Sequence, residues 1–536
     1  METQLKKFIK SYEERIQPLY TETNLAYWRA SNSGKHEDWA LCEAAQLKLT
    51  ELHASKEDFA TLKNIRDSDT VRDELLLRQL NTLYNSYIYN QADIGKLKEK
   101  IRLETEIEQK YTNFRAKVGG RLIADNEIEK ILKTSTDNNL LQEAWLSHKR
   151  IGPLVSEEIK LLVKLRNDIA QELGFDNYHE MRLRLNDQDP NEVAQLFDEL
   201  DELTRDSFAS LKQEIDHHLA GMYGVEPRNL KPWHYQNRFF QEAPQIYNLD
   251  LDRYYAGQDV IELTRKFYSG IGLDIGNIIA KSNLYEKPGK NQHAYCTHID
   301  RKGDVRGLCN TRPNHSWMNT NLHEFGHAVY ELNLDFTLPF VLRDPAHTFT
   351  TEAIAMIFGR FAGNPVWMHD MGIITSEEVK KIEKECFNNL RLEQMVFSRW
   401  SQVMFRFEKY MYENPAQNLN SLWWKLVEEY QLLTKPEHRD EPDWAAKIHI
   451  AAYPCYYHNY HLGELLASQL FFYITANVIG SHDFRNQSFV NRPEIGYYLK
   501  KNLFRPGSQW HWSKMIEKAT DEKLTARYYA RQFVEY

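Results

Sequence analysis

The residues of this chain best suited to chemistry are His323, Glu324 and His327, within the pentapeptide His-Glu-Phe-Gly-His. Residues i and i+4 of an α-helix share one face, so the two imidazoles can bind one metal ion. Glu324 lies about 100° further around such a helix, where its carboxylate can reach a water molecule beside the metal. This pattern indicates a zinc site that activates water for hydrolysis.

A catalytic zinc ion commonly keeps three protein ligands and one open position, so the pattern requires a third ligand. The residues after His327 lack the His-x-x-Gly-x-x-His extension that would supply a third histidine. Glu352, 25 residues further on, opens a second apolar helical segment and fits a site of two histidines and one glutamate. Its rival Glu331 follows His327 by one turn, which places it beyond the metal. We therefore expect His323, His327 and Glu352 to bind one zinc ion per chain; alternatively, Glu352 merely favours the first turn of a helix.

Composition excludes several other classes of protein. The 536 residues include 67 basic and 76 acidic side chains, a net charge of −9, which argues against a nucleic-acid binder. No run of 18 apolar residues predicts a membrane span, and the first residues lack the apolar core of a secretory signal. Five cysteines without Cys-x-x-Cys spacing indicate neither a disulfide framework nor a cysteine zinc site. We expect a cytoplasmic protein, or alternatively a periplasmic or secreted one whose signal has been removed.

Most of the chain has the apolar spacing of helices. Residues 156–173 predict a helix that begins with Ser156 as its N-cap and ends before Gly174. Residues 376–412 predict one long helix. Residues 293–311 alternate by two around Gly303, which predicts a β-hairpin just before the metal motif. The sequence contains no internal repeat and no long Gly/Ser linker, which favours one continuous helical body.

From about residue 280 onward the chain resembles the angiotensin-converting-enzyme family of zinc peptidyl-dipeptidases, and the similarity continues more diffusely through the N-terminal half. Residues 322–355 resemble the zinc segment of that family. The pair His293-Ala294 resembles the pair that holds the substrate backbone, and the hairpin after it resembles the edge strand to which an extended peptide adds. Further resemblances are Trp423-Trp424, Lys447-Ile-His449 and Tyr457-His-Asn-Tyr460.

The resemblance implies an all-α, mainly helical fold: an elongated ellipsoid of two helical halves around a deep substrate groove, with a small hairpin near the active site. Residues 1–536 would form a single catalytic unit, with the zinc and substrate core at 290–465. Such a groove admits oligopeptides and excludes folded proteins. We expect a monomer that binds oligopeptides and neither nucleic acid nor a membrane.

The resemblance also assigns roles to the later residues. Lys447 and Tyr457 would bind the C-terminal carboxylate of a peptide, His449 would donate to a carbonyl or leaving amine, and Tyr460 would stabilise the oxyanion. Glu324 would be the general base of an enzyme that releases dipeptides. Taken singly, each of these side chains is equally consistent with a solvated lysine, a structural histidine or aromatic packing.

Two alternatives remain open at the level of sequence. One is an oligopeptidase of the thimet or oligoendopeptidase-F type, which has the same metal motif and a different cleavage rule. The other is an inactive helical binding scaffold, against which the intact metal motif argues.

The chain departs from the family pattern at several positions. Met356 stands where the family has an aspartate four residues after the glutamate ligand, so another group must support a zinc-bound histidine. Gln292 stands in place of a cysteine, which removes a disulfide around the hairpin. The family glutamine that completes carboxylate recognition has no clear counterpart, and Arg253 is near its place. Val427 and Asn459 replace two arginines that hold chloride, which predicts an activity independent of chloride.

Overall fold

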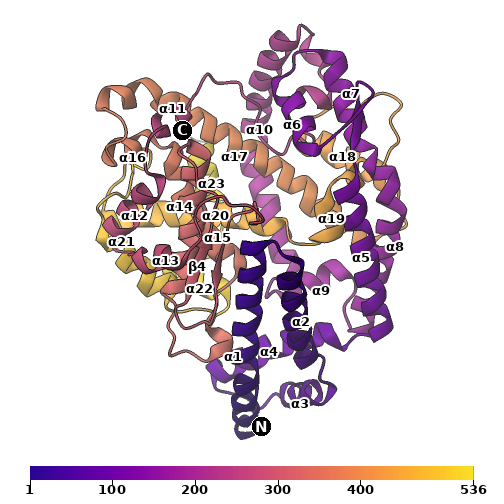
Figure 1. Cartoon of the computed structure of the whole chain (residues 1–536), viewed down its shortest axis with the longest axis vertical. Helices are drawn as coiled ribbons and strands as arrows, with labels where there is room; N and C mark the ends of the chain where they lie inside the picture. The colour runs from indigo at the N-terminus through magenta and orange to yellow at the C-terminus, as the bar shows by residue number, and fades with distance from the viewer. Residues whose placement is uncertain (535–536) are drawn as a thin grey trace. The chain divides into compact units, whose positions relative to one another are not determined.

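The structure, a computed structural model, describes residues 1–534 and is mainly helical in that part of the chain (Figure 1). Its described strands form two small antiparallel two-stranded sheets, β1–β2 and β3–β4. The expectation of an all-α fold with a small hairpin is therefore confirmed, and β1–β2 is a second hairpin that the sequence did not predict.

The chain folds into two compact units, each assembled from segments that are far apart in the sequence. The first unit comprises Met1–Gln91, Leu249–Cys386 and Leu462–Tyr528. The second comprises Ala92–Asn248, Phe387–His461 and the last residues from Tyr529. Three helices contain residues of both units: α17 (Ser376–Glu413), α20 (His458–Tyr473) and α23 (Arg527–Phe533). The stretch His458–Ile479 has the length and composition of a membrane span, but 72% of its apolar part is buried within the protein.

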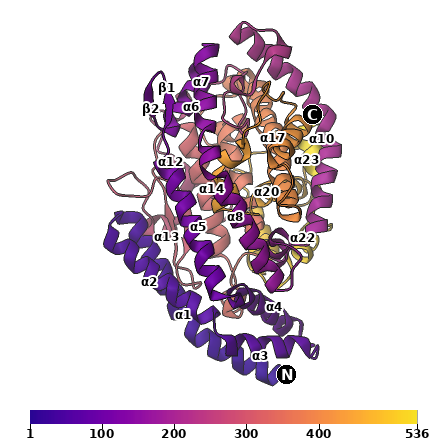
Figure 2. The ribbon, with the colours of Figure 1, turned by 90° about the vertical axis from the view of Figure 1, so that its right-hand side faces the viewer.

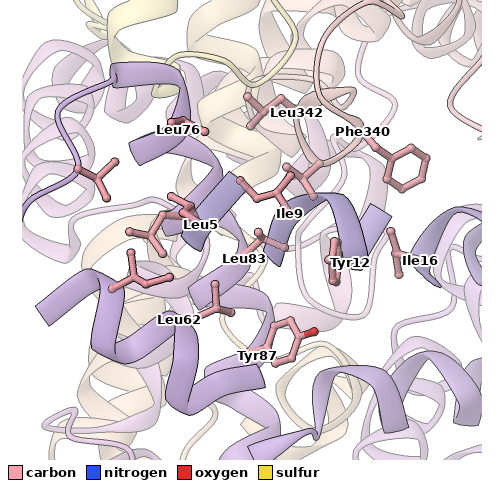
Figure 3. Packing of buried hydrophobic residues seen from close by; sticks show 14 residues of the cluster. Leu5, Ile9, Tyr12, Ile16, Leu62, Leu76, Leu83, Tyr87, Phe340 and Leu342 are labelled. Atoms are coloured by element: carbon pink, nitrogen blue, oxygen red, sulfur yellow. The ribbon is translucent and has the colours of Figure 1, made fainter. Parts of the chain in front are cut away.

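The first unit begins with four helices, α1 (Glu2–Ser33), α2 (His36–His53), α3 (Lys56–Asp67) and α4 (Glu74–Ile88). α1 and α2 lie side by side, as Figures 1 and 2 show. Leu5, Ile9, Tyr12 and Ile16 recur every three or four residues along α1 and pack into one buried cluster (Figure 3). That cluster includes side chains of α3 and α4 and of the short 3-10 helix Phe340–Leu342, so apolar burial joins the start of the chain to the segment that precedes α15.

The remainder of the first unit contains the metal motif and the predicted hairpin. In chain order its main elements are α11 (Asp252–Tyr255), α12 (Val260–Gly270), α13 (Gly276–Lys281), β3 (Tyr295–His298), β4 (Val305–Leu308), α14 (His315–Leu332), α15 (Thr348–Arg360), α16 (Pro365–Asp370), α21 (Pro493–Leu499) and α22 (Trp512–Thr520). β3 pairs with β4 in the register Tyr295 opposite Leu308 and His298 opposite Val305. The hairpin predicted within residues 293–311 is therefore present.

The second unit consists of α5 (Ile94–Asn113), β1 (Ala116–Val118), β2 (Arg121–Ile123), α6 (Asp125–Thr134), α7 (Asn138–Lys149), α8 (Ile151–Glu172), α9 (Tyr178–Leu185), α10 (Pro190–Tyr223), α18 (Leu419–Leu426) and α19 (Ile448–Ala452), with parts of the shared helices. α5 and α8 lie side by side (Figures 1 and 2). The prediction that Ser156 caps its helix is wrong, because α8 begins at Ile151 and Ser156 is buried inside it. Ile151 and Val155 extend the apolar face of α8 by one more turn towards its start.

Candidate active site

The residues predicted from the sequence fall into two groups, one in each unit. His293, Ala294, His323, Glu324, His327 and Glu352 belong to the first unit. Lys447, His449, Tyr457 and Tyr460 belong to the second.

The metal motif lies on α14, and a glycine allows α15 to pack closely against it. A side chain at Gly326 would place its Cβ 2.7 Å from the Cα of Ala355 and 3.1 Å from the backbone nitrogen of that residue. Any residue other than glycine would therefore force the two helices apart. Asn319 of α14 strengthens the contact by donating its Nδ2–H to the carbonyl of Gly359 on α15, at 3.0 Å. This close packing brings Glu352, near the start of α15, to the histidine face of α14.

Three ligand atoms converge where the two helices meet. The Nε2 atoms of His323 and His327 are 3.3 Å apart, and they lie 3.4 and 3.5 Å from the two carboxylate oxygens of Glu352. A tetrahedral zinc ion with bonds of about 2.0–2.1 Å requires ligand atoms about 3.3–3.4 Å apart. The geometry and the donor set of two imidazoles and one carboxylate therefore fit a zinc ion, as expected from the sequence.

Burial tunes the protonation of this metal cluster, which we define as His323, Glu324, His327 and Glu352. Burial lowers the pKa of His323 to about 4 and that of His327 well below its usual range, so both imidazoles are neutral, the form that binds metal. Burial also raises the pKa of Glu352 to about 7. Burial and the charge of Glu352 raise the pKa of Glu324 to about 8. Packing two carboxylates and two neutral imidazoles together is favourable when a divalent cation balances the negative charge.

Thr351 takes the supporting position that the sequence left open at Met356. Its hydroxyl lies 2.9 Å from Nδ1 of His327, so the ring can direct its Nε2 lone pair towards the metal position. The signal in the sequence was the hydroxyl residue directly before Glu352. Met356 instead packs beside Gly463, where an added Cβ would lie 3.3 Å from its sulfur and 3.1 Å from Cγ of Glu352. Gly463 thus leaves room for the glutamate ligand.

The hairpin supports the other side of α14. The backbone N–H of Cys296 on β3 hydrogen-bonds to the carboxylate of Glu324 and opposes the rise in its pKa. Glu331, the rival third ligand, has its carboxylate 3.1 Å from Nδ1 of His298, also on β3. The structure therefore uses Glu331 to join α14 to the hairpin. His293 is exposed and Ala294 is half-buried, directly before β3.

In the second unit the ammonium of Lys447 is enclosed by aromatic rings. Its Nζ lies 5.2–5.5 Å from the ring centroids of Phe239, Trp400 and Tyr457 and donates to Oε1 of Gln241 at 2.5 Å. Among the described residues, no carboxylate oxygen lies within 4 Å of it. Burial, followed by the positive charge of Arg238, lowers the pKa of Lys447 to about 7, and the negative charges of Glu242 and Glu129 oppose this shift only in part.

Gln241 is the functional candidate that the sequence missed. It supplies the amide beside Lys447 for which no clear counterpart was found, whereas Arg253 forms an ion pair with Glu378 at 2.9 Å in the first unit. The signal was weak, because a single glutamine about 200 positions before Lys447 has no spacing that links the two.

The aromatic group around Lys447 also contains the remaining predicted residues. The ring of Tyr457 lies 5.4 Å from both His449 and Tyr460, in edge-to-face contacts. Its hydroxyl accepts a hydrogen bond from Nε1 of Trp400 at 2.7 Å. Burial, with a smaller contribution from the charge of Lys447, lowers the pKa of His449 to about 4 and keeps its ring neutral. The structure thus brings Lys447, His449, Tyr457 and Tyr460 together with Gln241, and we call these five residues the lysine cluster.

Comparison with known proteins decides the family. The family model described as angiotensin-converting enzyme matches residues 1–536, the entire chain. The chain belongs to the angiotensin-converting enzyme family. It is therefore a peptidase of that family, as the resemblance implied.

Individual relatives are distant. The chain is 22% identical over 437 residues to the angiotensin-converting enzyme of Theromyzon tessulatum, a match that covers 75% of this chain and 70% of that protein. It is 21% identical over 485 residues to the enzyme of Bos taurus, covering 84% of this chain. It is also 24% identical over 272 residues to carboxypeptidase 1 of Bacillus subtilis, covering 44% of this chain and 50% of that protein. The matched region is only 36% of the length of the Bos taurus protein.

Proposed function

We propose that this peptidase depends on zinc and shortens oligopeptides from their C-terminal end, releasing dipeptides. The observation that carries the C-terminal rule is the buried ammonium of Lys447, which has an amide and aromatic rings around it but no carboxylate partner among the described residues. Such a site is complementary to a carboxylate brought by a ligand. The three ligand atoms of the metal cluster support zinc dependence.

Glu324 carries the proton chemistry in this proposal. His323, His327 and Glu352 would hold a zinc ion, which would supply positive charge to polarise the scissile carbonyl and make water more acidic. The Glu324 carboxylate accepts the proton of the attacking water and then delivers it to the leaving amine. The backbone N–H of Cys296 hydrogen-bonds to that carboxylate and favours its charged form.

The lysine cluster recognises the end of the peptide in this proposal. The Lys447 ammonium and the Nε2–H of Gln241 donate to the C-terminal carboxylate. Since the Tyr457 hydroxyl accepts from Trp400, its own proton is directed elsewhere and can be the third donor. Tyr460 and the neutral His449 remain the proposed donors to the developing oxyanion and to the leaving group.

Three alternatives are tested beside this proposal. One relative is named carboxypeptidase 1, and removal of a single residue would use the same carboxylate site. An endopeptidase of the thimet or oligoendopeptidase-F type would share the metal cluster and have no use for an unpaired lysine. An inactive scaffold would have neither zinc nor activity.

The test combines metal analysis with mass spectrometry of products. We expect one zinc ion per chain, dipeptide products from short peptides with a free C-terminus, and little cleavage of the same peptides with a C-terminal amide. Glu352→Gln should lose zinc, whereas Glu331→Gln should retain it, because Glu331 faces His298. An active preparation without zinc would overturn zinc dependence, and equal cleavage of amidated peptides would overturn the C-terminal rule.

A further inference from the structure

A buried arginine of the second unit donates hydrogen bonds to the segment that contains Lys447 and His449. Arg166 of α8 is 0% exposed. Its Nη2 donates to the carbonyl of Ala451 at 2.5 Å and forms an ion pair with Glu104 at 2.7 Å. Its Nη1 donates to the carbonyl of Ile450 at 3.4 Å and to the Tyr412 hydroxyl at 3.1 Å. One guanidinium therefore binds two consecutive backbone carbonyls of α19.

Those carbonyl groups lack hydrogen-bond donors within their own helix. α19 spans only Ile448–Ala452, and the last four carbonyls of any helix lack partners inside it. A helix of five residues is also too short to be stable by itself. The Arg166 guanidinium supplies both the missing donors and a positive charge at the negative end of the helix.

A buried glutamate fixes the other end of the same segment. Glu408 of α17 is 2% exposed, and its Oε1 accepts a hydrogen bond from the backbone N–H of Cys455 at 2.8 Å. Cys455 has a φ of 56°, in the left-handed region that residues other than glycine rarely adopt. Burial raises the pKa of Glu408 to about 8, and the positive charge of Arg166 opposes that rise.

Arg166 and Glu408 thus hold both ends of the chain between His449 and Tyr457. Ile450 directly follows His449, and Cys455 precedes Tyr457 by two residues. The Tyr111 hydroxyl holds the chain just before Lys447, because it donates a hydrogen bond to the carbonyl of Ala445. We propose that Arg166 and Glu408 are positioning residues that hold Lys447 and Tyr457 in the geometry required by a C-terminal carboxylate; this inference rests on the proposed function.

A buried guanidinium and a buried carboxyl group are inefficient as general stabilisers. Apolar side chains of similar volume often stabilise a core equally well, because they avoid the cost of desolvating a charge. What an apolar residue cannot supply is directed hydrogen bonding to particular backbone atoms. The inference therefore predicts a local loss of order around residues 445–458 when these bonds are removed.

The variants Arg166→Met and Glu408→Met test this inference. Arg166→Met removes the donors, and Glu104 keeps a partner because Lys100 lies 2.9 Å from it. Glu408→Met removes the acceptor, whereas Glu408→Gln retains an oxygen for the Cys455 N–H. Arg399→Met is the matched control, because Arg399 is also a buried arginine of this unit but forms an ion pair with Asp201.

Hydrogen exchange followed by mass spectrometry provides a readout independent of activity. Peptides that cover residues 445–458 should exchange at least tenfold faster in Arg166→Met and Glu408→Met, and at the wild-type rate in Glu408→Gln and Arg399→Met. The KM for peptides with a free C-terminus should rise about 10- to 100-fold in the first two variants, since small misplacements of binding groups have effects of that size. The KM for amidated peptides should change little.

Unchanged exchange at 445–458, or an equal increase throughout the second unit, would overturn the inference. An equal rise in KM for free and amidated peptides would also overturn it, because general destabilisation has that effect. A wild-type enzyme that does not distinguish the two kinds of peptide would refute the proposed function instead, and the exchange rates would still decide whether Arg166 and Glu408 order the segment.

Discussion

The metal cluster and the lysine cluster are built in opposite ways. The metal cluster comes from two consecutive helices, α14 and α15, and its ligand atoms span only His323 to Glu352. Its imidazole nitrogens and carboxylate oxygens surround a position that fits a cation. The lysine cluster draws on Gln241 and on residues 447–460, and its ammonium also lies beside the rings of Phe239 and of Trp400 on α17.

The two clusters differ in the kind of partner that each would accept. The nitrogen and oxygen acceptors of the metal cluster fit a cation. The buried ammonium of the lysine cluster is complementary to a carboxylate, and the proposed C-terminal rule rests on it. Each cluster can be tested separately.

The largest effect is expected at the metal cluster. Glu324→Gln should retain zinc, because Glu324 is not one of the three ligands, and should lower kcat by about 10²–10⁴-fold, the usual contribution of a positioned general base. Zinc content and kcat for a free peptide measure the two effects. Glu331→Gln, on the same helix, is the control and should keep both near wild type. A Glu324→Gln enzyme with nearly wild-type kcat would show that another group is the base.

Removal of the cation from the lysine cluster should have the next largest effect. Lys447→Ala should reduce kcat/KM for peptides with a free C-terminus by about 10- to 150-fold, the value of one charge-assisted contact. Amidated peptides should be poor substrates of both enzymes, and zinc content should not change. If both kinds of peptide lose activity equally, Lys447 has a structural role only.

Loss of the hydroxyl group that supports the metal cluster should have a smaller effect. Thr351→Val preserves the shape of the side chain but removes the hydroxyl 2.9 Å from Nδ1 of His327. Loss of such a supporting bond typically weakens metal affinity by about 10- to 100-fold, as competition with a chelator would measure. Thr351→Ser keeps the hydroxyl and should bind zinc normally. Wild-type affinity in Thr351→Val would show that the hydroxyl does not support the ligand.

The lysine cluster should make peptide binding sensitive to pH. The pKa of Lys447 is lowered to about 7, so the free enzyme has its ammonium below pH 7 and loses it as the pH rises. Because a bound carboxylate favours the ammonium, binding above pH 7 requires uptake of a proton, and KM should rise about tenfold per pH unit. The comparison of free and amidated peptides between pH 6 and 9 measures this rise. In Lys447→Ala this rise in KM should be absent, and its persistence would assign it to another group.

Chloride should have the smallest effect, namely none. Asn459 accepts a hydrogen bond from Gln188 at 2.8 Å, and the buried carboxylate of Asp443 already serves Trp424 and Arg439. Neither Val427 nor Asn459 supplies a cation at its position, and an anion placed there would gain too little to offset its desolvation. Replacement of chloride by acetate at constant ionic strength should leave kcat/KM unchanged. A saturable, several-fold activation specific to chloride would contradict this expectation.

The sequence alone was sufficient for features governed by local periodicity. The spacing of i and i+4 places His323 and His327 on one face of any helix, so the structure could only confirm that placement. The long helix from Ser376 and the hairpin after Ala294 follow from patterns of 3.6 and 2 residues in the same way. Ser156 shows the limit of this reasoning. It is a good capping residue, but the apolar face continues one turn before it, and the helix therefore begins at Ile151.

Only the tertiary structure decided which distant side chains meet. Gln241 contacts Lys447 across about 200 residues, and Thr351 rather than residue 356 supports His327. No regular spacing in the sequence marks either pair, because both contacts depend on how the helices pack and not on the period of any one helix. The sequence likewise contains both Glu331 and Glu352 as candidates for the third ligand. The close approach of α15 to Gly326 selects Glu352, since without that contact the carboxylate could not reach the two imidazoles.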